Sequence, residues 1–283
     1  PWYLRIQRRR ISCTQYGGAI EISFRFKESK CAYKCLLLHI QNQAAFLTFL
    51  TAGFPAKDDT PELLMALERG GADVIELGMP FSDPQADGPA IQESNRIALQ
   101  QGVDYAMCLK YIKEARSRGL KVPVVLMGYY NPIMAYGEER AVHDAKSAGA
   151  NGFILVDLLP EEAGTFLNAC RREKMAFVPL IAPTTDVNRI RYLSSLADAF
   201  IYVVSRLGTT GVSASVSSSL GELMSRIRSA TDSPLAVGFG VSTREHFIEV
   251  GALSEGVVIG SKLVQCLKES EATTEARAKA AFE

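Results

Sequence analysis

The sequence predicts an α/β fold in which eight parallel strands and their helices close into a single (β/α)₈ barrel, the TIM-barrel fold. Its 283 residues and 47% hydrophobic content suit one such barrel with a large core. Short apolar runs alternate with helical segments, and this alternation favours parallel strands over hairpins. The third observation is a weak internal repeat of helix-end punctuation before every even-numbered run: Gly71-Ala72-Asp73, Gly149-Ala150-Asn151, Ala197-Asp198-Ala199 and Gly251-Ala252.

The individual elements are predicted from local patterns. Thr60-Pro61 starts a helix with an N-cap residue and a proline, and Gly70 ends it. Residues 105–118 have the periodicity of an amphipathic helix that stops before Gly119. Eight strands favour a closed barrel, with an open doubly wound sheet as the alternative. The strand candidates are rich in β-branched and aromatic residues: Phe46–Thr51, Val74–Leu77, Val124–Met127, Gly152–Val156, Ala176–Ile181, Phe200–Val204, Leu235–Phe239 and Gly256–Ile259.

Residues 1–43 differ in composition from the rest of the chain. Four arginines lie among the first eleven residues, and no acidic residue precedes Glu21. Such a start is found in organellar targeting segments, but a poorly ordered tail is the favoured interpretation. The spacing of Cys31, Cys35 and His39 would align them on a helix, yet a fourth ligand is lacking and no metal site is predicted. We therefore expect an atypical segment over 1–43 and one barrel domain over 44–283.

The bulk composition excludes several classes of protein. Lys and Arg number 31 and so do Asp and Glu, so the charge balance indicates no nucleic-acid partner. No apolar run reaches the roughly 20 residues of a membrane span, so no membrane association is expected. The six cysteines are too few and too scattered for a disulfide scaffold, which predicts reduced thiols in a cytoplasmic protein.

Glu76 lies inside an otherwise apolar run, at the end of the second strand where barrel active sites are built. Strand alternation puts Glu76 on the face of Val74, opposite Ile75 and Leu77. Burial disfavours the charged form of a carboxyl group and raises its pKa. A raised pKa suits general acid–base catalysis near neutral pH, an interpretation favoured here over a structural hydrogen bond.

The loop that follows, 78–89, contains three prolines, two glycines and two aspartates, which predicts a stiff polar loop. Asp87 precedes the helix that opens at Pro89, so it returns toward the strand end. A fixed carboxylate there would stabilise positive charge on a substrate N–H, whereas the alternative is a turn or N-cap aspartate. For Asp83, beside Pro84, the turn and functional interpretations weigh about equally.

Glycines follow the sixth, seventh and eighth strands. Backbone N–H groups at glycine turns and helix N-termini bind phosphate, and barrels often hold phosphate at the loops after strands seven and eight. The residues alone thus predict a barrel that binds a phosphate ester beside two carboxylates. The glycine-containing segments are 205–211, 238–242 and Gly260-Ser261.

One segment, IELGMPFSDPQADGP at 75–89, is long and distinctive. Together with 49–55, 202–211, 237–241 and 258–261 it resembles the tryptophan synthase α family, and the resemblance covers about Ala44 to Leu267. The resemblance implies a cofactor-free retro-aldol lyase that cleaves indole-3-glycerol phosphate into indole and glyceraldehyde 3-phosphate in the final stage of tryptophan biosynthesis.

The resemblance also assigns roles to residues. Glu76 would be the general acid–base, and Asp87 would hold the indole N–H. Arg206 and Thr210 would lie on a loop that closes over the substrate. The substrate pocket would be shaped by Tyr202, Phe49, Leu126, Tyr129 and Ile181, the last four of which would also pass as ordinary core; the phosphate would be held by Gly211, Gly240, Gly260 and Ser261.

The implied partner is a β component, separate or fused, in which pyridoxal phosphate joins indole to serine. The 80–84 loop and the Asn131-Pro132 region would form part of that interface. No cofactor of the chain's own is implied.

Three alternatives were weighed. A sugar isomerase barrel would want an acid or a cysteine at the first strand end, where Thr51 stands. An indole-glycerol phosphate synthase would want lysines at several strand ends, and none of the eight has one. A non-catalytic phosphate-binding barrel that binds or activates a partner is disfavoured because both Glu76 and Asp87 are present.

Overall fold

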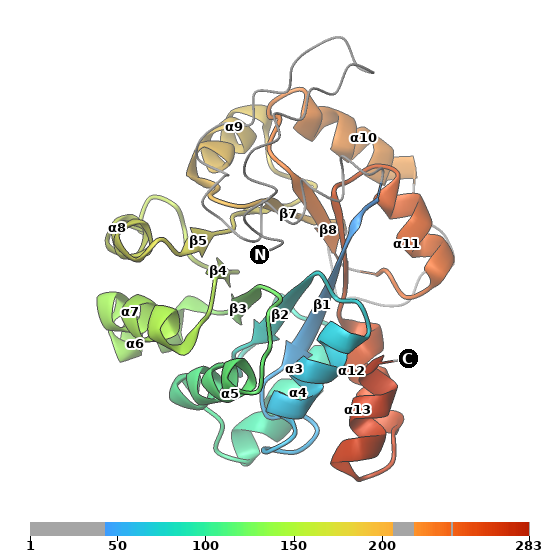
Figure 1. Ribbon diagram of the computed structural model, residues 1–283. Helices are drawn as coiled ribbons and strands as arrows, with labels where there is room; N and C mark the ends of the chain where they lie inside the picture. Colours follow the sequence, from blue (N-terminus) through green and yellow to red (C-terminus); the bar gives the residue numbers. More distant parts are fainter. Residues whose placement is uncertain (1–42, 206–217, 239, 283) are drawn as a thin grey trace, which may run out of the picture.

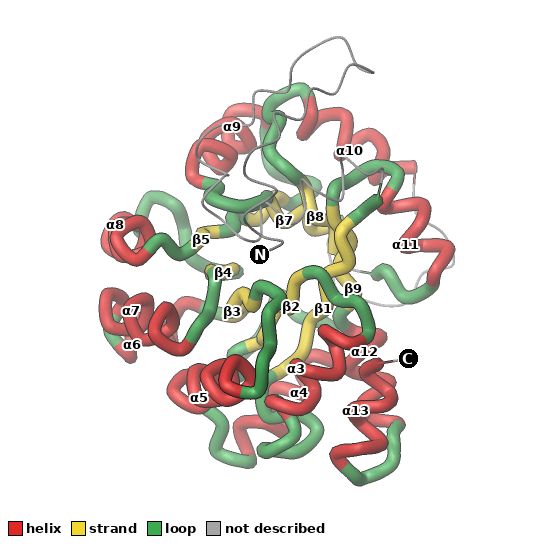
Figure 2. Tube along the Cα trace, viewed as in Figure 1, coloured by secondary structure: helices red, strands yellow, loops and turns green. Residues whose placement is uncertain are grey.

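The computed structural model describes residues 43–205, 218–238 and 240–282. Its strands form one parallel sheet that curls into an inner ring, with the helices arranged outside it (Figures 1 and 2). The sheet order is β5-β4-β3-β2-β1-β9-β8-β7-β6. This confirms the predicted (β/α)₈ barrel. The segment predicted to be atypical, 1–43, lies outside the described residues except for its last residue.

The strands fall where the apolar runs predicted them, within one or two residues at each end. All nine are short and almost wholly buried because helices cover the outer face and side chains fill the interior. They are β1 (Ala45–Thr51), β2 (Val74–Gly78), β3 (Val124–Gly128), β4 (Gly152–Leu155), β5 (Ala176–Phe177), β6 (Leu180–Ile181), β7 (Ile201–Val204), β8 (Leu235–Gly238) and β9 (Gly256–Ile259).

The predicted fifth strand, 176–181, is divided into β5 and β6. Val178 N donates to Phe153 O at 3.0 Å, and Tyr202 N donates to Pro179 O at 2.9 Å. Pro179 has no N–H to donate, which interrupts the ladder between the two pieces. This one stretch therefore pairs with β4 on one side and β7 on the other, and it closes the barrel.

The helices alternate with the strands and cover the outside of the ring. Asp104 caps the helix that follows it by accepting from Met107 N at 2.9 Å, and Asp186 caps another by accepting from Asn188 N at 2.8 Å. The helices are α3 (Thr60–Arg69), α4 (Pro89–Gln100), α5 (Tyr105–Ser117), α6 (Tyr130–Tyr136), α7 (Glu138–Ala148), α8 (Gly164–Glu173), α9 (Val187–Leu196), α10 (Ser218–Arg228), α11 (Arg244–Gly251), α12 (Ser261–Glu269) and α13 (Thr274–Phe282).

A buried polar contact attaches the last helix to the first described one. Arg277 on α13 forms an ion pair with Asp59, the N-cap of α3, and Thr274 Oγ1 bonds Asp59 Oδ1 at 2.6 Å. Helix α13 thereby packs beside α3 and α12 (Figure 1). These contacts bring the end of the chain to the first βα unit of the barrel.

The register defines which side chains point into the barrel. Phe49 on β1, Glu76 on β2 and Val125 on β3 are neighbours in the ladder and share the inner face. A second cluster lies outside β6–β9, where Val203 and Ile201 pack with Ile190 and Leu193 of α9. The layer beneath the helices on this side of the barrel is thus distinct from the main core, which joins the interior to the layer beneath α3 to α8.

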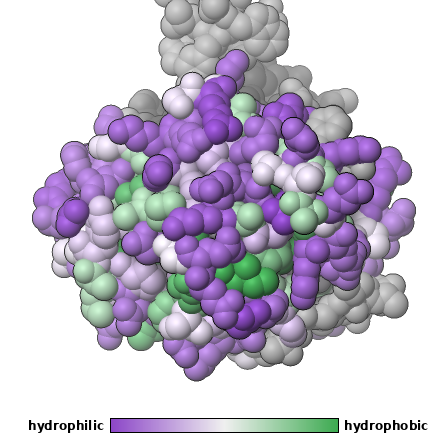
Figure 3. All heavy atoms as spheres, turned by 90° about the horizontal axis from the view of Figure 1, so that it is seen from below, coloured by the Kyte–Doolittle hydropathy of each residue, from purple (hydrophilic) through white to green (hydrophobic). Residues whose placement is uncertain are grey.

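The outer surface is mainly polar. The face seen from below in Figure 3 is covered largely by hydrophilic residues around a compact hydrophobic patch. Among the described residues, no helix combines the length and apolar character that crossing a bilayer requires. The described residues also hold no group of three or more His, Cys, Asp or Glu side chains arranged for a metal ion. Cys31, Cys35 and His39 lie outside them.

Candidate active site

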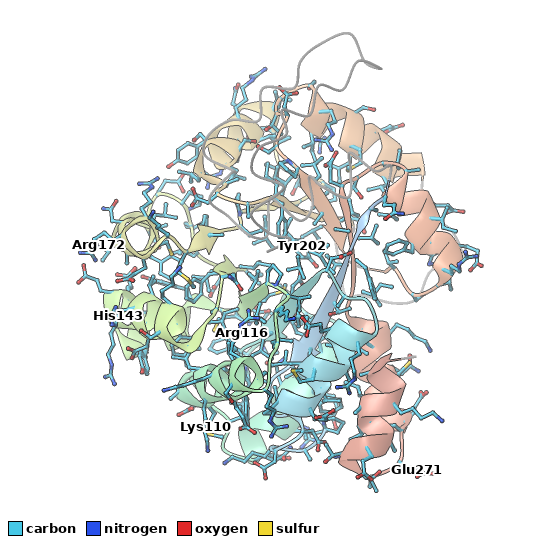
Figure 4. The ribbon with its side chains drawn as sticks, viewed as in Figure 1. Lys110, Arg116, His143, Arg172, Tyr202 and Glu271 are labelled. Carbon is cyan, nitrogen blue, oxygen red and sulfur yellow. The ribbon has the colours of Figure 1, made fainter. Side chains whose placement is uncertain are left out.

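A cavity of about 260 Å³ opens at the carboxyl ends of the strands. Its walls come from β1, β3, β7 and β9 and from the openings of α4 and α12, so chain segments far apart in sequence meet there. Figure 4 shows Tyr202 within the ring of strands, whereas Lys110, His143 and Arg172 lie on outer helices. The lining residues are Phe49, Asp87, Pro89, Ala90, Ile91, Met127, Tyr202, Gly240, Val241, Ser242, Val258, Gly260, Ser261, Lys262 and Gln265.

Glu76 is a fully buried carboxyl group beside this cavity. It is 0% exposed, and neither Oε1 nor Oε2 has a hydrogen-bond partner among the described residues. It pairs in register with Phe49, a lining residue, and shares its face. Burial raises the pKa of Glu76 to about 8. The group is therefore mostly protonated at neutral pH, with a proton to give and no structural partner to hold it.

Asp87 lies at the cavity wall in a different environment. The Tyr129 hydroxyl donates to Asp87 Oδ2 at 3.1 Å and accepts from Ala86 N at 2.9 Å. Burial raises the pKa of Asp87 to about 6, and the Tyr129 hydrogen bond opposes that rise. Asp87 is therefore mostly ionised at neutral pH. At neutral pH the two carboxyl groups are therefore in opposite protonation states. Such a difference allows one group to act as an acid while the other acts as an anion.

Tyr202 links the two carboxyl groups. It is buried, and its pKa is raised well above the usual value by burial and then by the charges of Glu76 and Asp87. Its hydroxyl lies so close to Gly238 that a Cβ there would come within 2.1 Å of it. Gly238 is therefore needed for the position of Tyr202. Glu76, Asp87 and Tyr202 form one electrostatically coupled group at the cavity.

The loop between β2 and α4 is held at both ends. Phe81 N donates to Asn95 Oδ1 at 2.9 Å, and the Phe81 ring stacks on Tyr129 with centroids 4.9 Å apart. Tyr129 in turn bonds Asp87. Asp83 is exposed and accepts from Ser82 Oγ at 2.5 Å, as a turn residue would. The sequence predicted that the loop brings Asp87 back toward the end of the strand. It did not predict the contact with Asn95 that helps to fix this loop.

A comparison with known protein families identifies the family of this chain. The family model described as tryptophan synthase alpha chain matches residues 37–283. The chain belongs to the tryptophan synthase alpha chain family. Members of that family are lyases that cleave indole-3-glycerol phosphate.

Individual relatives agree with this assignment. Tryptophan synthase of Saccharomyces cerevisiae is 57% identical over 225 residues, which make up 79% of this chain and 32% of the yeast protein. The chain thus spans about a third of that relative's length. The tryptophan synthase alpha chain of Geotalea uraniireducens is 46% identical over 229 residues, or 81% of this chain and 85% of the relative. A solved tryptophan synthase structure from Mycobacterium tuberculosis superimposes with a TM-score of 0.82 at 30% identity and covers 90% of this chain and 96% of that one.

Two residues that were predicted to line the pocket, Leu126 and Ile181, lie on the outer face of their strands. Leu126 pairs with Leu77, opposite the face of Glu76, and Ile181 pairs with Val203 in the outer layer. Neither lines the cavity. A shift of one residue in a strand moves a side chain to the opposite face, so Met127 lines the cavity where Leu126 was predicted. Similarly, Leu180 instead of Ile181 shares the face of Tyr202.

The other predicted site residues divide into three groups. Phe49, Tyr202 and Asp87 line the cavity, as do the predicted phosphate residues Gly240, Gly260 and Ser261. Glu76 and Tyr129 are not among the lining residues, but Glu76 pairs in register with Phe49 and the Tyr129 hydroxyl donates to Asp87. Arg206, Thr210 and Gly211 lie outside the described residues.

Nine of the lining residues have no role assigned in the sequence analysis, among them Met127, Ser242 and Lys262. The register of β3 against Glu76 identifies Met127. The signal for Lys262 is a lysine in the first turn of a helix, where a positive charge is unfavourable.

Proposed function

We propose that Glu76 and Asp87 carry out the cleavage of indole-3-glycerol phosphate to indole and glyceraldehyde 3-phosphate in this cavity. The observation that carries the proposal is Glu76, a carboxyl group that is fully buried, without a hydrogen-bond partner among the described residues, and protonated near neutral pH. Burying a polar group without a hydrogen-bond partner destabilises the folded state, and no structural contact compensates for that cost. Proton transfer to and from a bound substrate accounts for it.

The chemistry balances without a cofactor. The Glu76 carboxyl group gives its proton to indole carbon 3, and the resulting positive charge spreads to the ring nitrogen. The Asp87 carboxylate accepts the hydrogen bond of that N–H and stabilises the cation. The Glu76 carboxylate then takes the proton of the side-chain hydroxyl on the adjacent carbon. That oxygen's electrons form the aldehyde carbonyl as the carbon–carbon bond breaks, and the bonding pair returns to the ring. Glu76 ends protonated, ready for another cycle.

The rest of the cavity supports the same substrate. Phe49, Met127 and Tyr202 offer apolar and aromatic surface for an indole ring. Gly240, Gly260 and Ser261 lie where backbone N–H groups meet the start of α12, a suitable place for the phosphate. The loop residues Arg206, Thr210 and Gly211 are proposed, from the resemblance alone, to close over the substrate and to help hold the phosphate.

The alpha chain family implies a beta partner for this chain and suggests no cofactor of its own. We propose that the partner, separate or fused, carries pyridoxal phosphate and joins the released indole to serine. The 80–84 loop and the Asn131-Pro132 region are proposed as part of the contact surface. A cytoplasmic location remains a prediction. The comparisons lend no support to a non-catalytic barrel.

The direct test incubates the purified chain, with and without a tryptophan synthase beta component, with indole-3-glycerol phosphate. Indole and glyceraldehyde 3-phosphate are quantified separately. The proposal predicts the two products in equal amounts. Glu93→Gln serves as the matched control for Glu76→Gln, because Glu93 on α4 pairs with Arg96 and does not line the cavity; it should release both products at the unmodified rate.

Two results would contradict the proposal. Failure to release either product, even with the beta component present, would refute the lyase function. Normal release by Glu76→Gln would preserve the substrate but remove Glu76 from the proton transfers.

A further inference from the structure

We propose that Lys262 provides a cationic side chain that binds the phosphate of the substrate, with the Ser242 hydroxyl as a second ligand. The resemblance assigned the phosphate only to backbone positions and to Ser261. This inference rests on the proposed function and deepens it, because it adds charge recognition at the phosphate end of the same cavity.

The first argument is the distribution of charge around the cavity. Within the part of the chain that the structure describes, Asp87 is the acidic residue lining the cavity and Lys262 is the basic one. Lys262 is half-buried and follows Ser261 in the first turn of α12. The substrate has a complementary asymmetry, with an N–H that gains positive charge at one end and a phosphate dianion at the other. A cavity lined by one acidic and one basic side chain offers a complementary group to each of these parts of the substrate.

The second argument is the cost of Lys262 where it stands. The N-terminus of a helix carries partial positive charge, so a lysine in the first turn is electrostatically disfavoured. Lys268, in the last turn of the same helix, occupies the favourable end. Lys262 has no hydrogen bond or ion pair with another described residue that would offset the cost. A phosphate group beside it would neutralise both the ammonium and the helix N-terminus.

The third argument is independent of Lys262. Ser242 also lines the cavity, and its Oγ atom is buried without a hydrogen-bond partner among the described residues. A buried hydroxyl without a partner is unfavourable and indicates a missing ligand. Ser242 follows Gly240 and Val241, which line the same wall. Ser242 and Lys262 come from different βα loops, so two unassigned polar groups flank the predicted phosphate residues.

The test compares Lys262→Met, which keeps the length of the side chain and removes the charge, with Lys268→Met on the same helix. Binding of glycerol 3-phosphate to each protein is measured by calorimetry, with glycerol as the uncharged control. Steady-state kinetics with indole-3-glycerol phosphate then separates kcat from KM. Lys262→Met should weaken glycerol 3-phosphate binding and raise KM by about tenfold to a hundredfold, with kcat within about twofold. Lys262→Arg should restore most of the binding, and Ser242→Ala should weaken it by about threefold to tenfold.

The outcomes separate this inference from the proposed function. Unchanged glycerol 3-phosphate affinity in Lys262→Met overturns the inference, whether or not the chain cleaves indole-3-glycerol phosphate. An equal loss in Lys268→Met also overturns it, because the effect would then be one of general charge. A third outcome is possible: the unmodified chain releases no indole, yet it binds glycerol 3-phosphate and the Lys262→Met variant does not. The phosphate subsite would then be supported and the proposed reaction refuted.

Discussion

Ionisable side chains at the two ends of the barrel have opposite environments. At the amino-terminal end, Glu255 accepts from Arg228 Nη2 at 2.5 Å and from Leu235 N at 2.7 Å. Arg116 donates to Gly149 O at 3.1 Å and, in all, to three backbone carbonyls and the side chain of Asn151. At the carboxyl end, Glu76 is more deeply buried than either and lacks a hydrogen-bond partner among the described residues. Partnered charges stabilise the scaffold, whereas Glu76, mostly neutral and without such a partner, is proposed to be retained for proton transfer.

A large loss of activity is expected from changing Asp87, second only to the loss expected from changing Glu76. Asp87→Asn removes the negative charge that is proposed to face the indole N–H, and it should lower kcat by about 10²- to 10³-fold. Because Asp87 acts ionised with a pKa of about 6 and Glu76 acts protonated with a pKa of about 8, kcat/KM should rise through pH 6 and fall above pH 8. The pH profile of indole release checks both points. If the rise of kcat/KM through pH 6 persists in Asp87→Asn, that rise reports the ionisation of another group.

The next prediction is that burial of Glu76 makes the free energy of unfolding depend on pH. Burial holds the folded-state pKa of Glu76 near 8, above the ordinary value of 4.5, so the folded protein binds more protons than the unfolded one. Stability should therefore fall as pH rises from about 4.5 to about 8. Glu76→Gln does not titrate, so its stability advantage should grow by about 3 kcal/mol between pH 5 and pH 8. Denaturant unfolding at the two pH values measures this; a constant difference would mean that Glu76 is not buried as a lone acid.

A smaller change in stability is expected at the amino-terminal end. Glu255→Gln leaves Arg228 without its carboxylate, which should destabilise the fold by about 2 kcal/mol. The Arg228 side chain is 33% exposed, so water limits the loss. The kcat of the folded fraction should be unchanged, because these residues lie at the opposite end from the cavity. A drop in kcat at temperatures where the variant is fully folded would break the separation of the two ends.

The smallest effect tests the assignment of strand faces. Met127→Leu changes the shape of the cavity wall and should shift KM for indole-3-glycerol phosphate by a few-fold. Leu126→Met conserves volume beneath the helices and should leave KM alone, with less than about 1.5 kcal/mol lost in stability. Steady-state kinetics of the pair decides between them. If the KM shift follows Leu126 instead, the register of β3 is one residue out.

The strands, the barrel and the two carboxyl groups could be predicted from the sequence because each leaves a local signal. Glu76 is polar within an apolar strand, so alternation identifies its face directly. Leu126 and Ile181 carried no such signal, because both faces of a barrel strand are buried and apolar and period two does not distinguish them. Only pairing to a strand of known orientation, such as β2 or β7, resolves the choice.

The remaining differences arise from contacts distant in sequence. Pro179 divides a strand that its composition predicts to be continuous, because its missing N–H matters only once the neighbouring strands are in place. Lys262 is an ordinary lysine in sequence, and its proposed role appears only when β1, the loop after β8 and the start of α12 meet around one cavity.

The central claim is tested most directly by comparing Glu76→Gln with Glu255→Gln in one experiment at pH 8. Indole release and the free energy of unfolding are measured on the same preparations. The two variants should change in opposite ways. Glu76→Gln should lose about 10²- to 10⁴-fold in kcat and become more stable. Glu255→Gln should keep its kcat and become less stable. If Glu76→Gln kept its activity or lost stability, Glu76 would be a structural residue and the distinction between the two ends would be wrong.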